Sequence, residues 1–399
     1  MKRQALTRTL SLILSFLLLL PFCLPLSVSA TQDVSALSIG APDDSLALNC
    51  KSAVLMEAHT GTVLYAQNAA EALPPASVTK IMTLLLVMEA LDAGKFKLDD
   101  VVTVSENAAS MGGSQVYLKV GETMTVEDML KSVVISSAND AAVALAEFVS
   151  GDVATFVRRM NERACELGMT STVFENVTGL DDTAERHLTS AMDIARMSRA
   201  LIAHPTILKY SSIWMDTIRG GAFGLTNTNR LVRFYRGATG LKTGSTAKAG
   251  FCVSVTAERE GLSLICVIMG AETRDIRNAQ ATRLLDWGFA NYAAYVAPEE
   301  TLPALPVTGG TVDSLPVVRK EFRCVLPREM LSKIECRTEL TDTVSAPVSQ
   351  GDELGKAVYL VDGKPIGEAA VTASQEVGRI GFFELWRRLS ARILLAARV

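Results

Sequence analysis

The sequence predicts an α+β fold, in which an antiparallel sheet carries a helical part and a small all-β domain follows. Three observations lead to this prediction. A strand hairpin opens the first large region, several helices separate it from a second hairpin, and one helix follows the second hairpin. From residue 298 onward, proline and glycine become frequent and the apolar runs are short. Hairpins on either side of a run of helices favour an antiparallel sheet over a doubly wound one.

The first hairpin is expected at residues 52–66, where two apolar runs flank a turn at 59–61. The apolar residues then follow a helical spacing over residues 77–93, and Gly94 is a typical signal for the end of a helix. The first strand pair and the first long helix are therefore expected to be near neighbours in the sequence.

Capping side chains mark the beginning of further helices. Thr125, with an aspartate three residues later, resembles a capping box at the start of a second helix. After a break at 136–139, a third helix is expected to end before Gly151, and Ser190 begins another. Side chains in a break between two helices can point into a cleft.

The second hairpin is expected from two apolar runs, residues 250–256 and 262–269, beside a strand near 239–243. A helix from about residue 278 to 292 then closes the first domain. Beyond it, the Asp-Gly pair at 362–363 lies between apolar runs and is a strong hairpin signal.

Four parts of the chain follow from these patterns. Residues 1–30 have the features of a secretory signal peptide, because basic residues precede an apolar stretch and a small-residue cleavage pattern. An uncleaved membrane anchor is the alternative. The remainder is too long for one ordinary domain, and we expect a larger domain at 31–297, an all-β domain at 300–375 and a terminal helix at 377–399.

Composition argues against several classes of function. The formal net charge of −4 argues against a nucleic-acid partner, because proteins that bind nucleic acids present basic surfaces. The 3 histidines have neither zinc-peptidase spacing nor a triad arrangement, so we expect no metal and no cofactor. Cys324 and Cys336 are candidates for a disulfide, because an exported protein meets an oxidising compartment.

The first chemical motif is Ser77-Val-Thr-Lys80 at the start of the first long helix. A serine and a lysine three positions apart lie on one helical face, so the amine can reach the hydroxyl. Free backbone N–H groups at a helix start also suit an oxyanion. The motif alone is weak evidence, because Ser245-Thr-Ala-Lys248 has the same spacing and a capping serine with a surface lysine is common.

The second motif is Ser137-Ala-Asn139 in the break between two helices. Ser105-Glu-Asn107 repeats this pattern, and both fit ordinary capping of helix ends. The position in an interhelical break favours the first of the two.

The third motif is Lys242-Thr243-Gly244 on a predicted strand. Gly244 would let a substrate backbone approach the strand, Lys242 would supply a positive charge, and Thr243 a hydroxyl for a carboxylate. Taken alone, it could equally be an edge strand with a solvated lysine.

Together the three motifs, each in a suitable predicted context, are characteristic of β-lactamases and penicillin-binding proteins. From about residue 52 to 295 the chain resembles the low-molecular-mass serine D-alanyl-D-alanine carboxypeptidases, including sporulation-associated ones of Gram-positive bacteria. Further matching segments are Thr178-Gly-Leu-Asp181 and Gly240–Gly250. The resemblance implies a β-lactamase/transpeptidase-like domain, peptidoglycan stem peptides as substrates and β-lactams as inhibitors.

The resemblance also implies roles in the chemistry. Ser77 would be acylated and Lys80 would act as its base, with a pKa lowered by burial and by Lys242. Ser137 and Asn139 would relay protons and hold the substrate amide. The backbone N–H groups of Ser77 and Ser245 would form an oxyanion hole.

The same resemblance implies where a substrate would bind. Lys242 and Thr243 would contact its terminal carboxylate, beside Gly244. Arg277 and Arg230 are further candidate carboxylate-binding residues.

Other functions share these motifs. A class A β-lactamase needs a deacylating glutamate between the second and third motifs, and Glu175 lies in that interval. An endopeptidase acting on cross-links has all three motifs. A peptidoglycan-binding module that has lost catalysis is the alternative from a different class, and the intact Ser77, Lys80 and Lys242 argue against it.

The tail predicts a peripheral membrane contact. Phe382, Trp386, Leu389 and Ile393 share one helical face, and arginines 387, 388, 392 and 398 lie largely opposite or at its borders. Arginines near the centre of a span are costly, so a helix lying on the membrane surface fits better than a spanning one. A helix docked on the β domain is the alternative. The expected location is the outer face of the cytoplasmic membrane or the cell wall.

Overall fold

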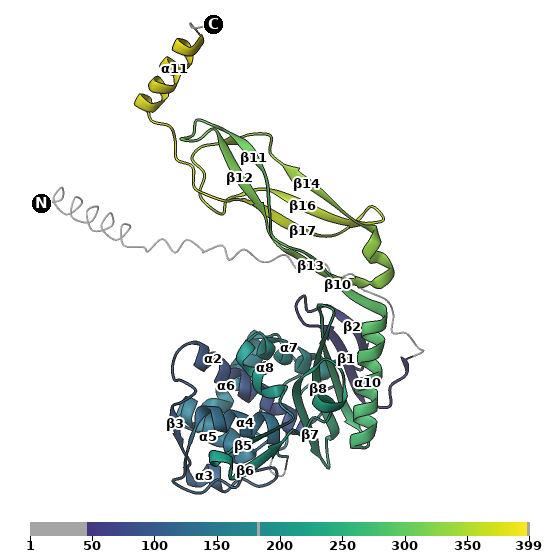
Figure 1. The fold of residues 1–399 in the computed structure, drawn as a ribbon. Helices are drawn as coiled ribbons and strands as arrows, with labels where there is room; N and C mark the ends of the chain where they lie inside the picture. Colours follow the sequence, from purple (N-terminus) through teal and green to yellow (C-terminus); the bar gives the residue numbers. More distant parts are fainter. Residues whose placement is uncertain (1–45, 182–183, 397–399) are drawn as a thin grey trace, which may run out of the picture. The chain divides into compact units, whose positions relative to one another are not determined.

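A computed structural model describes residues 46–181 and 184–396 of the chain (Figure 1). The predicted signal peptide, residues 1–30, lies outside the described residues and stays a prediction. Within the described part, the elements confirm the predicted α+β class.

A five-stranded sheet is the framework of the first region, with the strand order β2-β1-β9-β8-β7 and antiparallel pairing throughout. Both predicted hairpins are present, and the pairing of β1 with β9 joins them into one sheet. The strands are β1 (Ser52–Glu57), β2 (Val63–Gln67), β7 (Ala238–Thr246), β8 (Gly250–Arg259) and β9 (Leu262–Ala271).

Helices connect and follow the two hairpins. Two predicted caps are made as expected, because Thr125 and Ser190 each accept a hydrogen bond from the backbone N–H three residues later. The helices are η2 (Ala76–Thr79), α2 (Lys80–Asp92), α3 (Glu106–Ala109), α4 (Val126–Ser136), α5 (Asn139–Ser150), α6 (Val153–Glu166), α7 (Ala191–Ile202), α8 (Pro205–Ser211), η3 (Arg219–Gly221), α9 (Leu231–Phe234) and α10 (Arg274–Asn291). Short strand pairs lie among them: β3 (Val101–Thr103) with β4 (Thr123–Thr125), and β5 (Met215–Ile218) with β6 (Phe223–Thr226).

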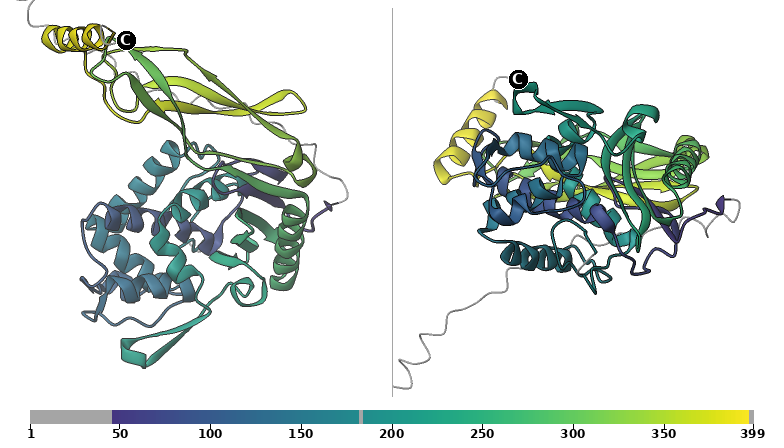
Figure 2. Two further views of the ribbon diagram at one scale, coloured as in Figure 1. Left: turned by 45° about the horizontal axis from the view of Figure 1, so that its top comes forward. Right: turned by 90° about the horizontal axis from the view of Figure 1, so that it is seen from below.

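Helices cover both faces of the sheet. Figures 1 and 2 show α10 along one face and a group of helices, among them α7, on the opposite side. Because side chains alternate between faces of a strand, Val54 packs in the core shared with the helices while Leu55 packs in the core under α10. Burial on both faces explains why the central strands are almost continuously apolar.

Two predicted helix boundaries differ from the structure. The helix expected from Ser77 begins as the 3₁₀ turn η2, and the α-helix starts only at Lys80. α10 starts at Arg274, four residues before the expected position, because the Thr273 side chain caps it by accepting a hydrogen bond from Ile276 N. As a result, Ser77 lies in the short 3₁₀ turn η2, and Arg277 lies in the first turn of α10.

The segment after α10 is all-β, as predicted. β10 pairs with β13, and a six-stranded sheet has the order β14-β16-β17-β12-β11-β15. Asp362 and Gly363, both with positive φ, join β16 to β17 in the predicted hairpin. The strands are β10 (Tyr292–Ala297), β11 (Glu300–Thr308), β12 (Ser314–Arg319), β13 (Phe322–Pro327), β14 (Ile334–Leu340), β15 (Val344–Ser345), β16 (Glu353–Val361) and β17 (Lys364–Ala373), with the 3₁₀ helix η4 (Arg328–Lys333) before β14.

Aromatic packing holds part of this all-β region. Phe322 stacks on Tyr359 with ring centroids 3.9 Å apart and planes inclined by 8°. Cys324 and Cys336, the candidates for a disulfide, are both free thiols. Side-chain packing and strand pairing, and not a disulfide between these two cysteines, hold this region together.

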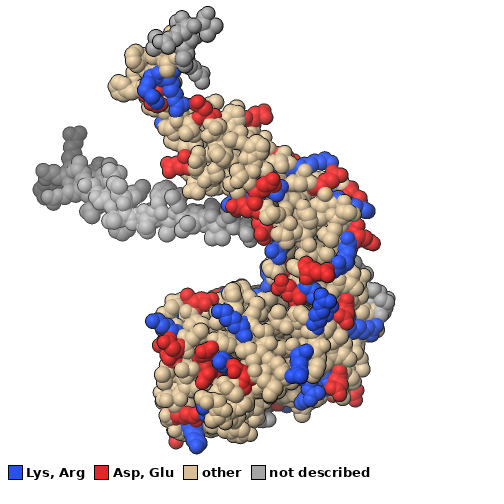
Figure 3. All heavy atoms as spheres, in the orientation of Figure 1, with Lys and Arg blue, Asp and Glu red and all other residues tan. Residues whose placement is uncertain are grey.

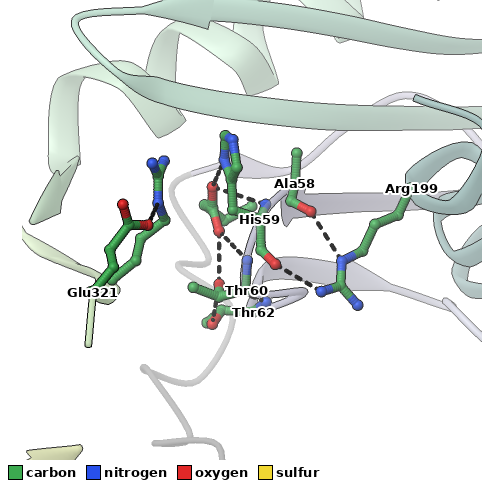
Figure 4. A network of polar contacts seen from close by, with 8 residues as sticks. Ala58, His59, Thr60, Thr62, Arg199 and Glu321 are labelled. Carbon is green, nitrogen blue, oxygen red and sulfur yellow. Dashed lines mark hydrogen bonds and ion pairs between the residues drawn. The ribbon is translucent and has the colours of Figure 1, made fainter. Parts of the chain in front are cut away.

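A buried carboxylate orders the turn between β1 and β2 (Figure 4). Glu57 is 1% exposed, and its oxygens accept hydrogen bonds from the backbone N–H groups of His59 and Thr60, at 3.1 and 2.7 Å. The Arg199 guanidinium donates to the carbonyls of Ala58 and His59 from α7. The predicted turn is thus tied to the helical side of the sheet, and Nδ1 of the His59 ring lies 3.0 Å from the Glu57 carboxylate.

The terminal helix α11 (Phe382–Ala396) follows the all-β region. Across residues 46–181 and 184–396, no helix is both long enough and apolar enough to cross a membrane. In the same residues, no group of three or more histidine, cysteine, aspartate or glutamate side chains is arranged to hold a metal ion.

Candidate active site

Ser77 lies in the 3₁₀ turn η2, between the sheet and α2. The preceding residue, Ala76, has a φ of +49°, a left-handed conformation that an alanine rarely adopts. Ser77 itself is half-buried, whereas its neighbours Ala76 and Val78 are buried. The strained turn therefore presents the Ser77 hydroxyl at the edge of a packed core.

Lys80 is fully buried at the start of α2 and holds three oxygen contacts. Its Nζ lies 3.0 Å from Ser77 Oγ, 2.5 Å from Asn139 Oδ1 and 2.8 Å from the Thr178 carbonyl oxygen. Burial, and after it the charge of Lys242, hold the pKa of Lys80 well below its ordinary value of 10.5. Both causes favour a neutral amine.

The two acceptors beside Lys80 have fixed identities. The Thr178 carbonyl can only accept, and Asn139 presents its oxygen because its Nδ2 donates to the Gly112 carbonyl at 2.7 Å. A neutral Lys80 amine has two N–H groups, which these two oxygens accept. The lone pair of such a neutral amine would be directed toward Ser77 Oγ, 3.0 Å away.

The second motif lies in the predicted break between α4 and α5. Ser137 follows the last residue of α4 with a φ of +61°, and Asn139 is the first residue of α5. Both are buried, at 3% and 1% exposure. The left-handed turn at Ser137 points its hydroxyl at Lys242 Nζ, 2.7 Å away.

Lys242 is buried on β7, where its Nζ has two oxygen acceptors. Besides Ser137 Oγ, its Nζ donates to the Thr243 carbonyl at 2.9 Å. Burial, followed by the charge of Arg277, lowers the pKa of Lys242 to about 7. The Thr243 hydroxyl donates to Thr228 Oγ1 at 2.8 Å, which links β7 to the segment before α9.

Gly244 is needed for a close approach, but of a different partner from the one predicted. A Cβ at this position would lie 2.7 Å from Ser77 N and 2.9 Å from the Pro75 carbonyl oxygen. The residue therefore lets β7 lie directly against the η2 turn that contains Ser77, which brings Ser245 to the same edge. The approach of a substrate backbone to Gly244 stays a prediction.

A cavity of about 560 Å³ opens beside these motifs. Its lining includes Ser77, Ser137, Thr243, Gly244 and Ser245, together with both predicted arginines, Arg230 and Arg277. Lys80, Asn139 and Lys242 lie behind this lining, where they contact Ser77 or Ser137 or each other. Residues that the sequence did not single out complete the lining: Ser114, Trp214, Thr226, Asn227, Thr228, Phe234 and Arg274.

Guanidinium groups give the cavity a positive end. Arg277 is 3% exposed and donates to Asn278 Oδ1 at 2.9 Å and to the Cys252 carbonyl at 3.4 Å. Burial, and then the charge of Arg274, lower the pKa of Arg277 to about 10. Arg230 is exposed at the start of α9. Arg274 was not predicted as a site residue, because α10 was expected to start after it. The N-cap residue Thr273 is the sequence signal for the earlier start.

The two repeated motifs have structural partners elsewhere. Ser245 lies on β7, whereas Lys248 lies in the turn after this strand and donates to the Asp181 carbonyl at 3.0 Å. Ser105 Oγ and Asn107 Nδ2 both donate to the Glu147 carboxylate, at 2.6 and 2.8 Å. The structure thus separates the candidate motifs from their duplicates.

Glu175, the residue that would mark a β-lactamase, has a different environment. Its carboxylate accepts hydrogen bonds from the backbone N–H groups of Glu185 and Arg186, at 2.9 and 3.2 Å. Among the described residues, the cavity lining does not include it. Glu175 therefore holds its own loop together.

Comparison with known proteins shows the family to which the chain belongs. The profile of a family described as D-alanyl-D-alanine carboxypeptidase matches residues 38–273, and one described as penicillin-binding protein 5, C-terminal domain, matches residues 297–379. The chain is 42% identical to D-alanyl-D-alanine carboxypeptidase DacF of Bacillus subtilis, over 96% of this chain and 97% of the relative.

Solved structures are similar as well. Penicillin binding protein 5 from Haemophilus influenzae superposes with a TM-score of 0.72 at 32% identity, over 84% of this chain and 98% of that one. Penicillin-Binding Protein D2 from Listeria monocytogenes, in its ampicillin-bound form, has a TM-score of 0.56 at 33% identity, over 61% of this chain and 98% of that one. Sequence, fold and the three clustered motifs agree, and the chain belongs to the serine-type D-alanyl-D-alanine carboxypeptidases.

Proposed function

We propose that the enzyme removes the terminal D-alanine from peptidoglycan stem pentapeptides through an acyl-enzyme on Ser77, with Lys80 as the general base. One observation supports this assignment above the others. Lys80 Nζ has two obligate acceptors, at the Asn139 side chain and the Thr178 carbonyl, and its third contact is Ser77 Oγ. A buried neutral lysine so arranged can take the serine proton.

Acylation then forms one bond and breaks another. The Ser77 proton passes to Lys80 while Oγ bonds to the carbonyl carbon of the penultimate D-alanine. When the tetrahedral intermediate collapses, the peptide C–N bond breaks and the leaving amine takes a proton from the Ser137 hydroxyl. Lys242, 2.7 Å from that hydroxyl, replaces the proton. A pKa of about 7 for Lys242 suits a group that gives and regains a proton near neutral pH.

Hydrolysis of the ester restores the starting state. Water adds to the ester carbonyl and gives a proton, through Ser137, to Lys242. The Ser77 oxygen leaves with the proton held on Lys80. A β-lactam, which mimics the D-Ala-D-Ala terminus, would acylate Ser77 in the same way and stall at the ester.

Backbone N–H groups would stabilise the oxyanion. Gly244 lets β7 approach within contact of Ser77 N, so the N–H groups of Ser77 and Ser245 are candidates for a two-donor hole. Thr243, Lys242, Arg277 and the exposed Arg230 would bind the terminal carboxylate at the positive end of the cavity. Cleavage of cross-links by the same site is the remaining alternative, and only the identity of the released amine distinguishes it.

Arg277→Ala should discriminate between substrates with and without a terminal carboxylate. Since hydrogen bonds to charged groups contribute about 1.5–3 kcal/mol, kcat/KM for D-alanine release from a pentapeptide should fall by about 10- to 150-fold. Hydrolysis of a thioester that lacks the carboxylate should change by less than about threefold. The assay measures released D-alanine and thiol, with Arg277→Lys as a variant that keeps the charge. Equal losses on both substrates would make Arg277 a structural residue.

The domain division and the membrane contact are part of the same proposal. Residues 1–30 would export the protein, residues 31–297 would form the peptidase domain, and residues 300–375 a separate all-β domain. The apolar face of α11 supports a membrane contact, because Phe382, Trp386 and Ile393 are 74%, 65% and 68% exposed. The enzyme would then work at the outer face of the cytoplasmic membrane.

The charged side chains of α11 form ion pairs within the helix and with the all-β region. Arg387 and Arg388 pair with Glu384 at 2.7 and 3.2 Å, and the positive side chains at this end of the chain are visible in Figure 3. Arg388 also pairs with Asp313 of the all-β region at 2.8 Å, which is the contact that favours the docked alternative. The side chains of Arg392 and Arg398 lie outside the described residues.

Deleting residues 382–399, which leaves the buried Val377 and its pairing with Val348 in place, should release the signal-cleaved protein from membranes and leave penicillin labelling unchanged. The helix would bind through its apolar side chains and, at anionic lipid, through its arginines. Sedimentation with anionic vesicles, compared between the full and truncated proteins, measures this. Trp386→Ser in the full protein should weaken binding in part. Undiminished sedimentation of the truncated protein would contradict the proposed membrane contact.

A further inference from the structure

His187 is a buried histidine outside the three catalytic motifs. It is 5% exposed and lies just before Thr189, whose backbone pairs with Leu73 near the start of the nucleophile segment. Its Nε2 is 2.7 Å from Thr79 Oγ1, and its Nδ1 is 3.0 Å from the backbone nitrogen of Glu175. The ring therefore bridges a loop of the chain and the turn that contains Ser77.

The hydrogen-bond partners define which ring nitrogen carries the proton. The Glu175 N–H can only donate, so Nδ1 accepts and Nε2–H donates to Thr79. The pKa of His187 is lowered to about 4, chiefly by burial, while the carboxylates of Glu175 and Asp181 oppose this effect. The imidazole is thus neutral near pH 7.

Thr79 passes this contact on to the strained residue beside the nucleophile. Its hydroxyl accepts from His187 and donates to the Ala76 carbonyl at 2.8 Å. Ala76 has a φ of +49°, a conformation that the surroundings must hold in place. A chain of two hydrogen bonds therefore runs from the His187 ring to the residue that sets the position of Ser77.

The loop that carries Glu175 also contacts the base. The Thr178 carbonyl accepts from Lys80, and the Val177 carbonyl accepts from the Thr83 hydroxyl at 2.7 Å on the next turn of α2. One loop thus touches the nucleophile turn through His187 and the general base through Thr178. A change in the loop would alter the distance between Ser77 and Lys80.

We propose that His187 is a positioning residue for acylation: through Thr79 and the Ala76 carbonyl, it holds the Ser77 hydroxyl in line with Lys80. The inference rests on the proposed roles of Ser77 and Lys80. It assigns His187 no proton transfer and no contact with substrate. Its effect should therefore appear in the rate of bond formation and not in substrate affinity.

His187→Phe tests the proposal, since phenylalanine keeps a ring beside Phe174 but lacks both nitrogens. Misplacing reacting groups by about 1 Å costs up to about 100-fold in rate. We expect the acylation rate constant with a fluorescent penicillin to fall by about 10- to 100-fold, while the dissociation constant of the non-covalent complex changes by less than about twofold. His187→Gln, whose amide can still donate to Thr79, should recover most of the rate.

A double-mutant cycle shows whether the effect passes through Thr79. Thr79→Val removes the hydroxyl with little change in shape, and His187→Phe added to it should slow acylation by less than about twofold more. His204→Phe is the matched control, because His204 pairs with Asp92 and lies outside the cavity lining. Its acylation rate should equal that of the wild type. Rates are expressed per folded, titratable site, and thermal unfolding is recorded for each variant.

Three results would overturn the proposal. The first is a His187→Phe enzyme with a lower Tm and an unchanged acylation rate per folded site. The second is additivity of the two substitutions in the cycle, and the third is a loss confined to affinity. Mass spectrometry of the labelled wild type separates these outcomes from failure of the proposed function. An adduct on Ser77 keeps that function while the inference fails, whereas an adduct elsewhere rejects both.

Discussion

Replacing Ser77 with alanine should abolish covalent labelling by a fluorescent penicillin, because the Ser77 oxygen is the atom that the β-lactam acylates in the proposed mechanism and Lys80 is the base that takes its proton. Ser77 Oγ is 3.0 Å from Lys80 Nζ, and Lys80 is fully buried. Removal of a nucleophile in a serine hydrolase lowers kcat by roughly 10⁶-fold, so the labelled band should vanish from the gel. Release of D-alanine from a pentapeptide should stop as well.

Ser245→Ala is the matched control for this experiment. Ser245 has the same spacing to a lysine, but Lys248 donates to the Asp181 carbonyl. The proposed mechanism uses only the backbone N–H of Ser245, which alanine retains. Labelling should therefore persist within about tenfold of the wild-type rate. Labelling that survives the first substitution and disappears with the second would reverse the assignment of the nucleophile.

Gly179→Ala should both destabilise the protein and nearly abolish acylation. A Cβ at Gly179 would lie 1.8 Å from the Ala76 carbonyl oxygen and 2.3 Å from the Ala76 carbonyl carbon. Backbone atoms cannot move aside as a flexible side chain can, so the turn before Ser77 must shift. We expect a loss of about 3 kcal/mol or more in the free energy of unfolding. We also expect acylation to slow by at least about 100-fold.

Gly168→Ala separates this clash from simple backbone strain. Gly168 also has a positive φ, +68° against +82° at Gly179, but a Cβ there meets no atom within 4 Å. An alanine in this conformation should cost about 1–2 kcal/mol with no change in acylation per folded site. Urea unfolding and active-site titration of both variants measure the two quantities. Similar acylation rates in the two variants would contradict the account of the Ser77 turn.

Elements with local causes were predictable from the sequence. Thr125 and Ser190 begin α4 and α7 because a capping side chain bonds an amide three residues later, whatever lies further away. The Asp362-Gly363 turn follows from the φ preferences of its own two residues. The helix start at Arg274 is equally local, because the Thr273 side chain caps α10, and it differs from the start expected at residue 278.

The motifs themselves were readable, but their duplicates were not separable by spacing alone. Ser77 and Ser245 each precede a lysine by three residues, and the structure places the first pair in one helical turn and the second at a strand end. The same holds for Ser105 and Asn107, whose partner Glu147 lies about 40 residues away in the sequence. Whether a copy of a motif can take part in the reaction depends on the residues that the fold places next to it.

Other parts of the site have no signature in the sequence. The Thr178 contact with Lys80 is a backbone carbonyl, which any residue type could supply. The bridge from His187 to Thr79 spans 108 residues. The sequence by itself determined the α+β class, the hairpins, the caps and the three motifs, since these depend on neighbouring residues. The tertiary structure decided which motif copies meet and how far the lysine pKa values fall, because burial and the fields of Lys242 and Arg277 arise from segments far apart in the chain.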